Sequence, residues 1–245
     1  NAALAIGNQN EATGGASTAV GTWAKASGEA SVAMGNVAYA DKHASIAIGD
    51  YVNAEVPSGN KISTGEYATT VGSRSSATTD YATALGAENK ATGNMATSVG
   101  NHNTASGDGS AALGVNSEAT GRWAVAVGNV AKGIAQNATA IGNTVTASGN
   151  NSNAIGFRAA ASAENSTAMG TSTEASGDGA TAVGKAAKAK AQSAGAFGDT
   201  ANATGVQSLA AGYSTTATNQ DSNAIGSRTS STGKYATAVG TEANA

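Results

Sequence analysis

His43 and His102 are the two side chains of this 245-residue sequence best suited to acid–base catalysis near neutral pH. They stand at different positions of a sequence repeat and about four repeats apart. If successive repeats stack like neighbouring strands, the two residues are on the order of 20 Å apart, too far to form a dyad within one chain. We expect each histidine to be a solvated loop or strand residue, and we expect a protein that is not an enzyme.

Regularly spaced carboxylates form no acid–base pair either, because lysines share their place in the repeat. With the glycine that marks each repeat as position 0, this place is position +4, which holds Glu11, Glu118 and Glu174 as well as Lys25, Lys90, Lys132 and Lys188. A mixture of charges at one position is typical of a solubilising face.

Two Gly-Asp-Gly triplets, at 107–109 and 177–179, suggest turns rather than a ligand site. No Lys-Ser/Thr pair follows them, as a phosphate-binding loop would require. The sequence does not match the Gly-Gly-x-Gly-x-Asp nonapeptide of calcium-binding rolls, and it has no cysteine for a thiolate metal site. We therefore expect neither a metal nor a cofactor.

The composition excludes further classes of protein. Hydrophobic residues, mostly alanine, make up 40% of the chain, charged residues make up 12%, and the net charge is −3. The low charge fraction and the negative net charge argue against a nucleic-acid binder, which usually shows a basic patch. The chain has no run of about eighteen apolar residues that could span a membrane. Large aliphatic residues are too scarce for a conventional core of this length, so the order of the residues must explain the fold.

A repeat of 14 residues organises the chain. An aliphatic residue followed by glycine recurs from Ile6-Gly7 to Ile48-Gly49 and, after one interruption, from Val71-Gly72 to Val239-Gly240, which gives seventeen anchor glycines. A second glycine often stands at position +7, and the two positions together hold 27 of the 33 glycines. Such a register indicates a repeat protein rather than a disordered chain.

Between the glycines, small and larger side chains alternate with a period of two, as in Ser31-Val32-Ala33-Met34. Alternation with a period of two predicts strands, and glycine every seven residues would destabilise a helix. Glycine also gives the backbone the freedom that a sharp corner requires. We predict an all-β fold, a parallel β-solenoid whose 14-residue coils each contain two short strands.

Side-chain size indicates which positions face inward. Position −4 is alanine or serine in all seventeen repeats, and position −2 is alanine except at Thr70 and Ser98. Position +5 is alanine except at Gly133 and Ser231. Only a narrow interior between two closely spaced strands would restrict these positions to such small side chains.

Position −1 is almost always a large apolar residue and, by alternation, must point outward. An apolar stripe on the order of 80 Å long follows, which a soluble monomer does not expose. We expect copies of the chain to bury it in parallel, with folding coupled to assembly, although symmetry alone does not distinguish two copies from three. The stripe consists of Ile6, Val20, Met34, Ile48, Val71, Leu85, Val99, Leu113, Val127, Ile141, Ile155, Met169, Val183, Phe197, Ile225 and Val239, with Ala211 as its weak member.

The units Asn151-Ser152-Asn153-Ala154-Ile155-Gly156 and Asn165-Ser166-Thr167-Ala168-Met169-Gly170 resemble the NSVAIGxxS head repeat of YadA-type trimeric autotransporter adhesins. The resemblance covers essentially the whole chain, residues 1–245, as a single head domain. It implies a left-handed β-roll, a homotrimer, and display on the outer surface of a Gram-negative bacterium. We see no signal peptide, neck, heptad stalk or C-terminal barrel, so we expect a fragment of a longer protein that reaches the membrane only through a missing anchor.

An insertion of nine residues near 55–63 interrupts the register. Insertions in solenoids become loops on one face and are often binding sites, although a tolerated decoration is the simpler interpretation. Our candidates for ligand-facing residues are Pro57, Asn60 and Lys61 in the insertion, and Trp23 and Tyr51 at position +2. Another aromatic group stands at position +9 and comprises Tyr67, Tyr81, Trp123 and Tyr235. We favour a structural role for it, stacking between coils or packing against a neighbouring chain, over a role as exposed anchors for a host ligand.

The resemblance implies adhesion without catalysis, with self-association of bacteria as a further role. The implied partners are host matrix proteins (collagen-like, fibronectin or laminin) or a cell-surface receptor, and no nucleic acid. Two alternatives are an ice-binding solenoid, for which the threonines at position −3 are too often interrupted, and a spacer that projects another binding domain. A solenoid enzyme would need a polar cleft with a base, and the separated histidines argue against one.

Overall fold

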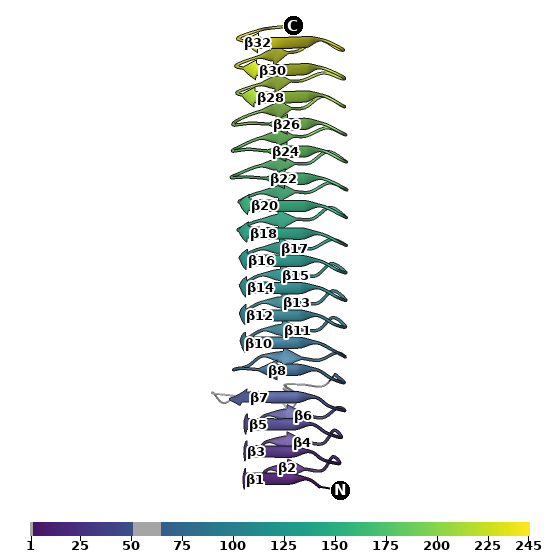
Figure 1. Ribbon diagram of the computed structural model, residues 1–245, viewed down its shortest axis with the longest axis vertical. Helices are drawn as coiled ribbons and strands as arrows, with labels where there is room; N and C mark the ends of the chain where they lie inside the picture. Colours follow the sequence, from purple (N-terminus) through teal and green to yellow (C-terminus); the bar gives the residue numbers. More distant parts are fainter. Residues whose placement is uncertain (1, 51–64) are drawn as a thin grey trace. The chain divides into compact units, whose positions relative to one another are not determined.

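The computed structural model describes residues 2–50 and 65–245, which contain strands and turns and no helix. They form two compact units, Asn1–Trp123 and Ala124–Ala245. Each unit is a parallel β-solenoid in which one longer and one shorter strand alternate along the chain (Figure 1). The predicted all-β solenoid is therefore confirmed.

In the first unit, the longer strands pair in parallel in the order of the chain. They are β1 (Leu4–Asn8), β3 (Thr18–Thr22), β5 (Val32–Asn36), β7 (Ile46–Asp50), β8 (Thr69–Val71), β10 (Thr83–Ala87), β12 (Thr97–Asn101) and β14 (Ala111–Val115). The shorter strands form two parallel groups. They are β2 (Glu11–Ala12), β4 (Lys25–Ala26) and β6 (Tyr39–Ala40), and then β9 (Ser76–Ala77), β11 (Lys90–Ala91), β13 (Thr104–Ala105) and β15 (Glu118–Ala119).

The second unit repeats this arrangement. Its longer strands are β16 (Val125–Asn129), β18 (Thr139–Asn143), β20 (Asn153–Phe157), β22 (Thr167–Met169), β24 (Thr181–Val183), β26 (Gly195–Phe197), β28 (Leu209–Tyr213), β30 (Asn223–Ser227) and β32 (Thr237–Thr241). Its shorter strands are β17 (Lys132–Gly133), β19 (Thr146–Ala147), β21 (Ala160–Ala161), β23 (Glu174–Ala175), β25 (Lys188–Ala189), β27 (Asn202–Ala203), β29 (Thr216–Ala217) and β31 (Ser230–Ser231).

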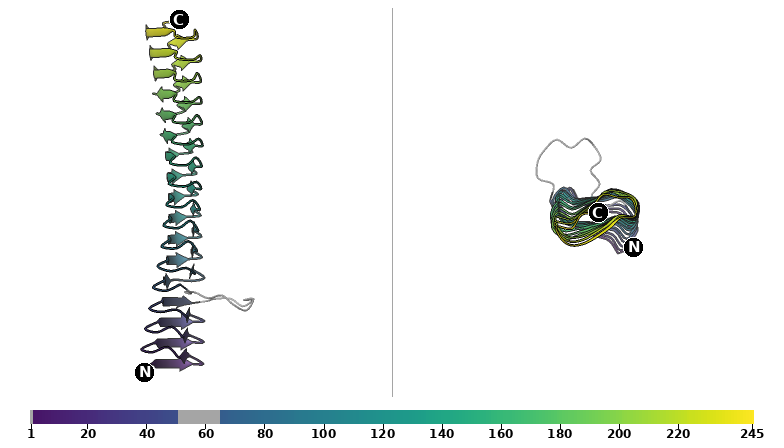
Figure 2. Two further views of the ribbon diagram at one scale, coloured as in Figure 1. Left: turned by 90° about the vertical axis from the view of Figure 1, so that its right-hand side faces the viewer. Right: turned by 90° about the horizontal axis from the view of Figure 1, so that it is seen from above.

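Like positions of successive repeats pair with one another. Ala140 pairs with Ala154, Ile141 with Ile155 and the anchor Gly142 with Gly156. Within a unit, successive coils superpose when seen from above, so every position of the repeat forms a column (Figure 2).

The interior is built from small side chains, as the sequence predicts. Alanines at positions −2 and +5, such as Ala84 and Ala91, are fully buried, and so is Ser31 at position −4. Apart from Val145, the buried apolar residues of the described part of the chain are all alanines. At positions −4, −2 and +5, each coil thus has room for little more than a methyl or hydroxymethyl group between its two strands.

The structure corrects the expected role of glycine at the corners. The sharp corners lie at positions +2 and +9, where the backbone has φ near +55° at residues such as Gln9 and Ala16, mostly without glycine. The glycines at +7 are not among the residues with positive φ. They are required by contact instead, because a Cβ on Gly177 would lie 2.0 Å from the carbonyl oxygen of Ala191 in the next coil.

Candidate functional site

The outward side of the longer strands carries the apolar stripe at position −1. Its side chains are partly exposed in both units, for example Met34 at 39% and Phe197 at 42% relative exposure. The inward neighbours Ala33 and Ala196 are fully buried, so the alternation along each strand confirms the outward direction.

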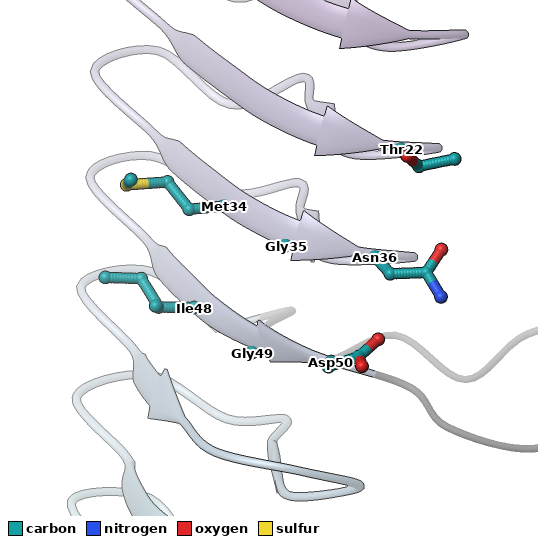
Figure 3. Close-up of a pocket in the computed structure, with 7 residues that line it drawn as sticks. All are labelled: Thr22, Met34, Gly35, Asn36, Ile48, Gly49 and Asp50. Atoms are coloured by element: carbon teal, nitrogen blue, oxygen red, sulfur yellow. The ribbon is translucent and has the colours of Figure 1, made fainter.

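A shallow groove follows the anchor glycines on this side of the first unit. Met34 and Ile48 lie along one edge, and the polar side chains of Thr22, Asn36 and Asp50 lie along the other (Figure 3). The glycines between the two edges have no side chains, so their backbone forms the floor of the groove. An apolar edge beside a polar edge can accept a surface of matching pattern, but it holds no acid–base or nucleophilic group apart from one carboxylate.

Charged side chains gather on the outward side of the shorter strands and pair from coil to coil. The Nζ atom of Lys25 lies 2.7 Å from Oε2 of Glu11. This hydrogen bond, together with the negative charge of Glu11, raises the pKa of Lys25 above its usual value. Pairs of this kind solubilise the face and contribute little to stability, because both groups are solvated.

Each histidine contacts a glutamate of the preceding coil, and the two histidines do not contact each other. His43 lies 3.8 Å from Glu29 and packs edge-on against the ring of Tyr67. His102 lies against Glu88, which also pairs with Arg74, so three +2 side chains form a polar ladder. Within residues 2–50 and 65–245, no three His, Asp or Glu side chains gather as a metal site would need.

The aromatic residues divide into stacked and free groups. Tyr67 and Tyr81 stack with ring centroids 5.1 Å apart and an interplanar angle of 9°, which confirms stacking between coils for this pair of the +9 group. Tyr235 of the same group is 64% exposed, with the Nζ atom of Lys234 4.8 Å from the centroid of its ring. Trp123 lies over Gly109, where a Cβ would come within 2.1 Å of the indole. Trp23 is 53% exposed at its corner and remains a candidate for ligand contact. The other candidates, Tyr51, Pro57, Asn60 and Lys61, lie outside the described residues.

A buried polar column at position +3 was missed by the sequence reasoning. The side chain of Asn103 donates to the carbonyl oxygens of Val99 (2.9 Å) and Gly114 (2.7 Å), and it accepts a bond from the amide of Ser117 (2.8 Å). Its own amide bonds to the side chain of Asn89, so the column links three coils. The alternation that places +5 inward places +3 inward as well, and it could have revealed this column.

The comparison with family models confirms the resemblance of the repeat units. The model of the YadA head domain repeat, which spans two copies, matches overlapping segments at 1–24, 12–38, 26–51, 63–89, 91–117, 105–131, 134–159, 147–173, 161–187, 175–201, 189–215, 203–229 and 217–243. The chain belongs to the YadA head family. A search of individual curated proteins gave no match.

In this YadA head, the residues of the repeat motif are mainly structural. Ser152 and Ala154 of one motif unit are fully buried, and Ile155 belongs to the outward stripe. The family match lapses between 51 and 63, around the expected insertion. In the described part, no helix is long and apolar enough to cross a membrane.

Proposed function

We propose that this YadA head is the ligand-binding part of a bacterial surface adhesin. The proposed assembly is a homotrimer of left-handed, parallel β-rolls with 14-residue coils, in which the apolar stripes of three chains face a common axis. The full-length protein would be anchored in the outer membrane, and this segment would project from the cell and would catalyse no reaction.

The partly exposed stripe on a member of this family carries the proposal. In both units, the apolar residues at position −1 keep much of their surface open while the interior holds mainly small side chains. Soluble proteins avoid large continuous apolar surfaces unless a partner covers them. Parallel copies in the same register would cover the stripe along its length, and the three-chain state follows the family.

The proposed ligands are host matrix proteins (collagen-like, fibronectin or laminin) or a cell-surface receptor, with self-association of bacteria as a further role. Binding would use the outward positions away from the stripe, repeated on many coils and on three chains. Weak contacts then add through multivalency. Trp23 is the one of our five candidate residues that the structure describes, and it is 53% exposed. Tyr51, Pro57, Asn60 and Lys61 remain candidates.

Two measurements test the proposal. Sedimentation equilibrium should give the mass of three chains, and a stable monomer would contradict the role of the stripe. The same preparation should then bind at least one immobilised matrix protein or a host cell surface. Failure on every matrix protein and on cells would reduce the segment to a spacer.

A further inference from the structure

The most basic segment of this acidic chain lies in one coil of the second unit. Lys185, Lys188 and Lys190 are three of the 13 basic residues of a chain with a net charge of −3. Lys188 begins β25 and points outward at position +4, and Lys190 follows at +6. Both are exposed on the shorter-strand side, away from the apolar stripe.

Beside these lysines, the outward side of the shorter strands is hollowed. The groove is lined mainly by Lys188, Lys190, Asn202, Thr204, Ser214 and Thr216. Lys188 pairs in register with Asn202, and Asn202 pairs with Thr216, so neighbouring polar groups repeat at about 4.8 Å along the stack. Ammonium, amide and hydroxyl groups thus form a regular polar grid on three successive coils.

The hollow has a cause in the sequence at the adjacent corner, position +2. This position holds small residues in these coils, Ala186, Thr200 and Ser214, and all three line the groove. Elsewhere in the same unit the corner is small at Thr144 and Ser172 but holds long side chains at Arg158 and Arg228. A long side chain at the corner would cover the edge of the groove, so its absence opens the grid to a ligand.

The groove has positive charge that the protein itself does not neutralise. Lys190 lies 3.6 Å from Glu174, and Lys185 pairs with Asp199 at 3.8 Å. Within the described residues, Lys188 has no ion pair. An anionic group placed over β25 would therefore meet one free ammonium group and a second that is only partly compensated.

The amide of Asn202 is also available to a ligand. Its Oδ1 atom is covered and accepts no hydrogen bond within the described part of the chain. Buried polar atoms are normally hydrogen-bonded, so turning this amide toward the groove sacrifices no bond at that oxygen. A ligand rich in hydroxyl groups would then find both a donor and an acceptor beside the lysines.

We propose that this groove binds an anionic oligosaccharide, with its sulfate or carboxylate groups on Lys188 and Lys190 and its sugar hydroxyls on Asn202, Thr204 and Thr216. The groove is too open and too polar for an apolar small molecule. A linear anionic sugar chain can lie across several coils and use the repeating donors. The inference rests on the proposed adhesin function and names one ligand class for it.

Affinity measurements on the complete 245-residue chain test the proposal. The probes are a heparin-derived octasaccharide, which carries sulfates, a hyaluronan octasaccharide, which carries only carboxylates, and poly-L-glutamate as an acidic peptide. We expect K188Q/K190Q to weaken octasaccharide binding roughly tenfold or more, because two charge-assisted contacts are lost. The matched control K132Q/K234Q, with the same change of charge in the same unit, should change it less than about twofold.

A second variant separates shape from charge. Ala186→Gln covers the edge of the groove without changing the charge, and glutamine already occupies this corner at Gln9 with φ +55°. It should weaken octasaccharide binding several-fold. Three results would each overturn the proposal. They are an equal loss of octasaccharide affinity in K188Q/K190Q and K132Q/K234Q, an unchanged affinity in Ala186→Gln, and tighter binding of poly-L-glutamate than of either octasaccharide. Adhesion to matrix proteins without octasaccharide binding would refute this site and leave the adhesin function standing.

Discussion

At the scale of single residues, glycine serves two separate purposes in this fold. The anchor glycines have positive φ, as at Gly142 (φ +137°), where a side chain would be strained. A Cβ on Gly142 would also lie 1.9 Å from the carbonyl oxygen of Gly156, so the anchor glycines allow a close approach to the next coil as well. The +7 glycines are needed for that approach alone, because their φ is not positive. The corners at +2 and +9 tolerate many residue types because a single left-handed residue costs only about 1 kcal/mol.

Two glycines of one coil allow a direct test of this distinction. Gly177→Ala should lower the free energy of unfolding by about 3 kcal/mol, because its Cβ would lie 2.0 Å from a carbonyl oxygen of the next coil. The control Gly179→Ala has open space and occupies a corner where Ala44 has φ +50°, so about 1 kcal/mol is expected. Thermal unfolding at one protein concentration measures both, and equal losses would contradict the assignment.

The buried asparagine column offers a second residue-scale test. Asn103→Ala should lower the free energy of unfolding by about 3 kcal/mol, because two carbonyl oxygens and the amide of Ser117 lose their partner in the interior. Asn103→Ser should cost only about 1 kcal/mol. At the same position, Ser75 donates to the carbonyl of Gly86 and accepts from the amide of Asn89. If Asn103→Ala leaves the free energy of unfolding unchanged, the column contributes little to stability.

At the scale of elements, the two strands of a coil have different outward surfaces. The longer strand presents the apolar stripe beside a polar edge, whereas the shorter strand presents paired charges and hydroxyl groups. Because both share one interior of small side chains, changes on one outer surface should leave the other intact. This separation makes matched variants on the two strands informative.

The stripe is tested by placing charge on it. The double variant I141D/I155D should shift the protein from trimer toward monomer in sedimentation equilibrium, because burying an unpaired carboxylate at the interface is costly. The control T146D/A160D carries the same charges on the shorter strands of the same coils and should remain trimeric. A trimer that survives both changes would place the interface elsewhere.

At the scale of the whole molecule, the interior gives little stability for the length of chain that it orders. A methyl group buries far less apolar surface than a leucine or phenylalanine side chain, and burial contributes about 25 cal/mol per Å². The largest further gain in stability would therefore come from burying the exposed apolar area of the stripe against other chains. We therefore expect folding and assembly to be coupled.

Coupling predicts that the melting temperature depends on protein concentration. Raising the concentration of chains about 100-fold should raise the melting temperature, since mass action favours the folded assembly over unfolded monomers. The I141D/I155D variant should melt at a lower temperature that no longer depends on concentration. Circular dichroism over a dilution series measures this, and a constant melting temperature for the unmodified chain would contradict coupled folding.

The sequence alone predicted the β-solenoid, its small-residue interior and the direction of the stripe. Each of these is a property of one repeat, because alternation and side-chain size show which way residues such as Ala154 and Ile155 point. A single short segment could be assigned to a strand only with ambiguity, but the same pattern recurs in seventeen repeats and so identifies the strands and their inward and outward sides. The family resemblance rested on the same residues, and the family comparison confirmed it.

Only the tertiary structure decided features that depend on neighbouring coils. The need for Gly177 arises from a carbonyl oxygen of the next coil, the asparagine column from bonds between coils, and the hollow beside Lys188 from small corners on three coils. Large aliphatic residues are too scarce in the sequence to fill a conventional core of this length. Stacking explains how the chain folds without one, because backbone pairing between coils and contacts within each column replace a large core.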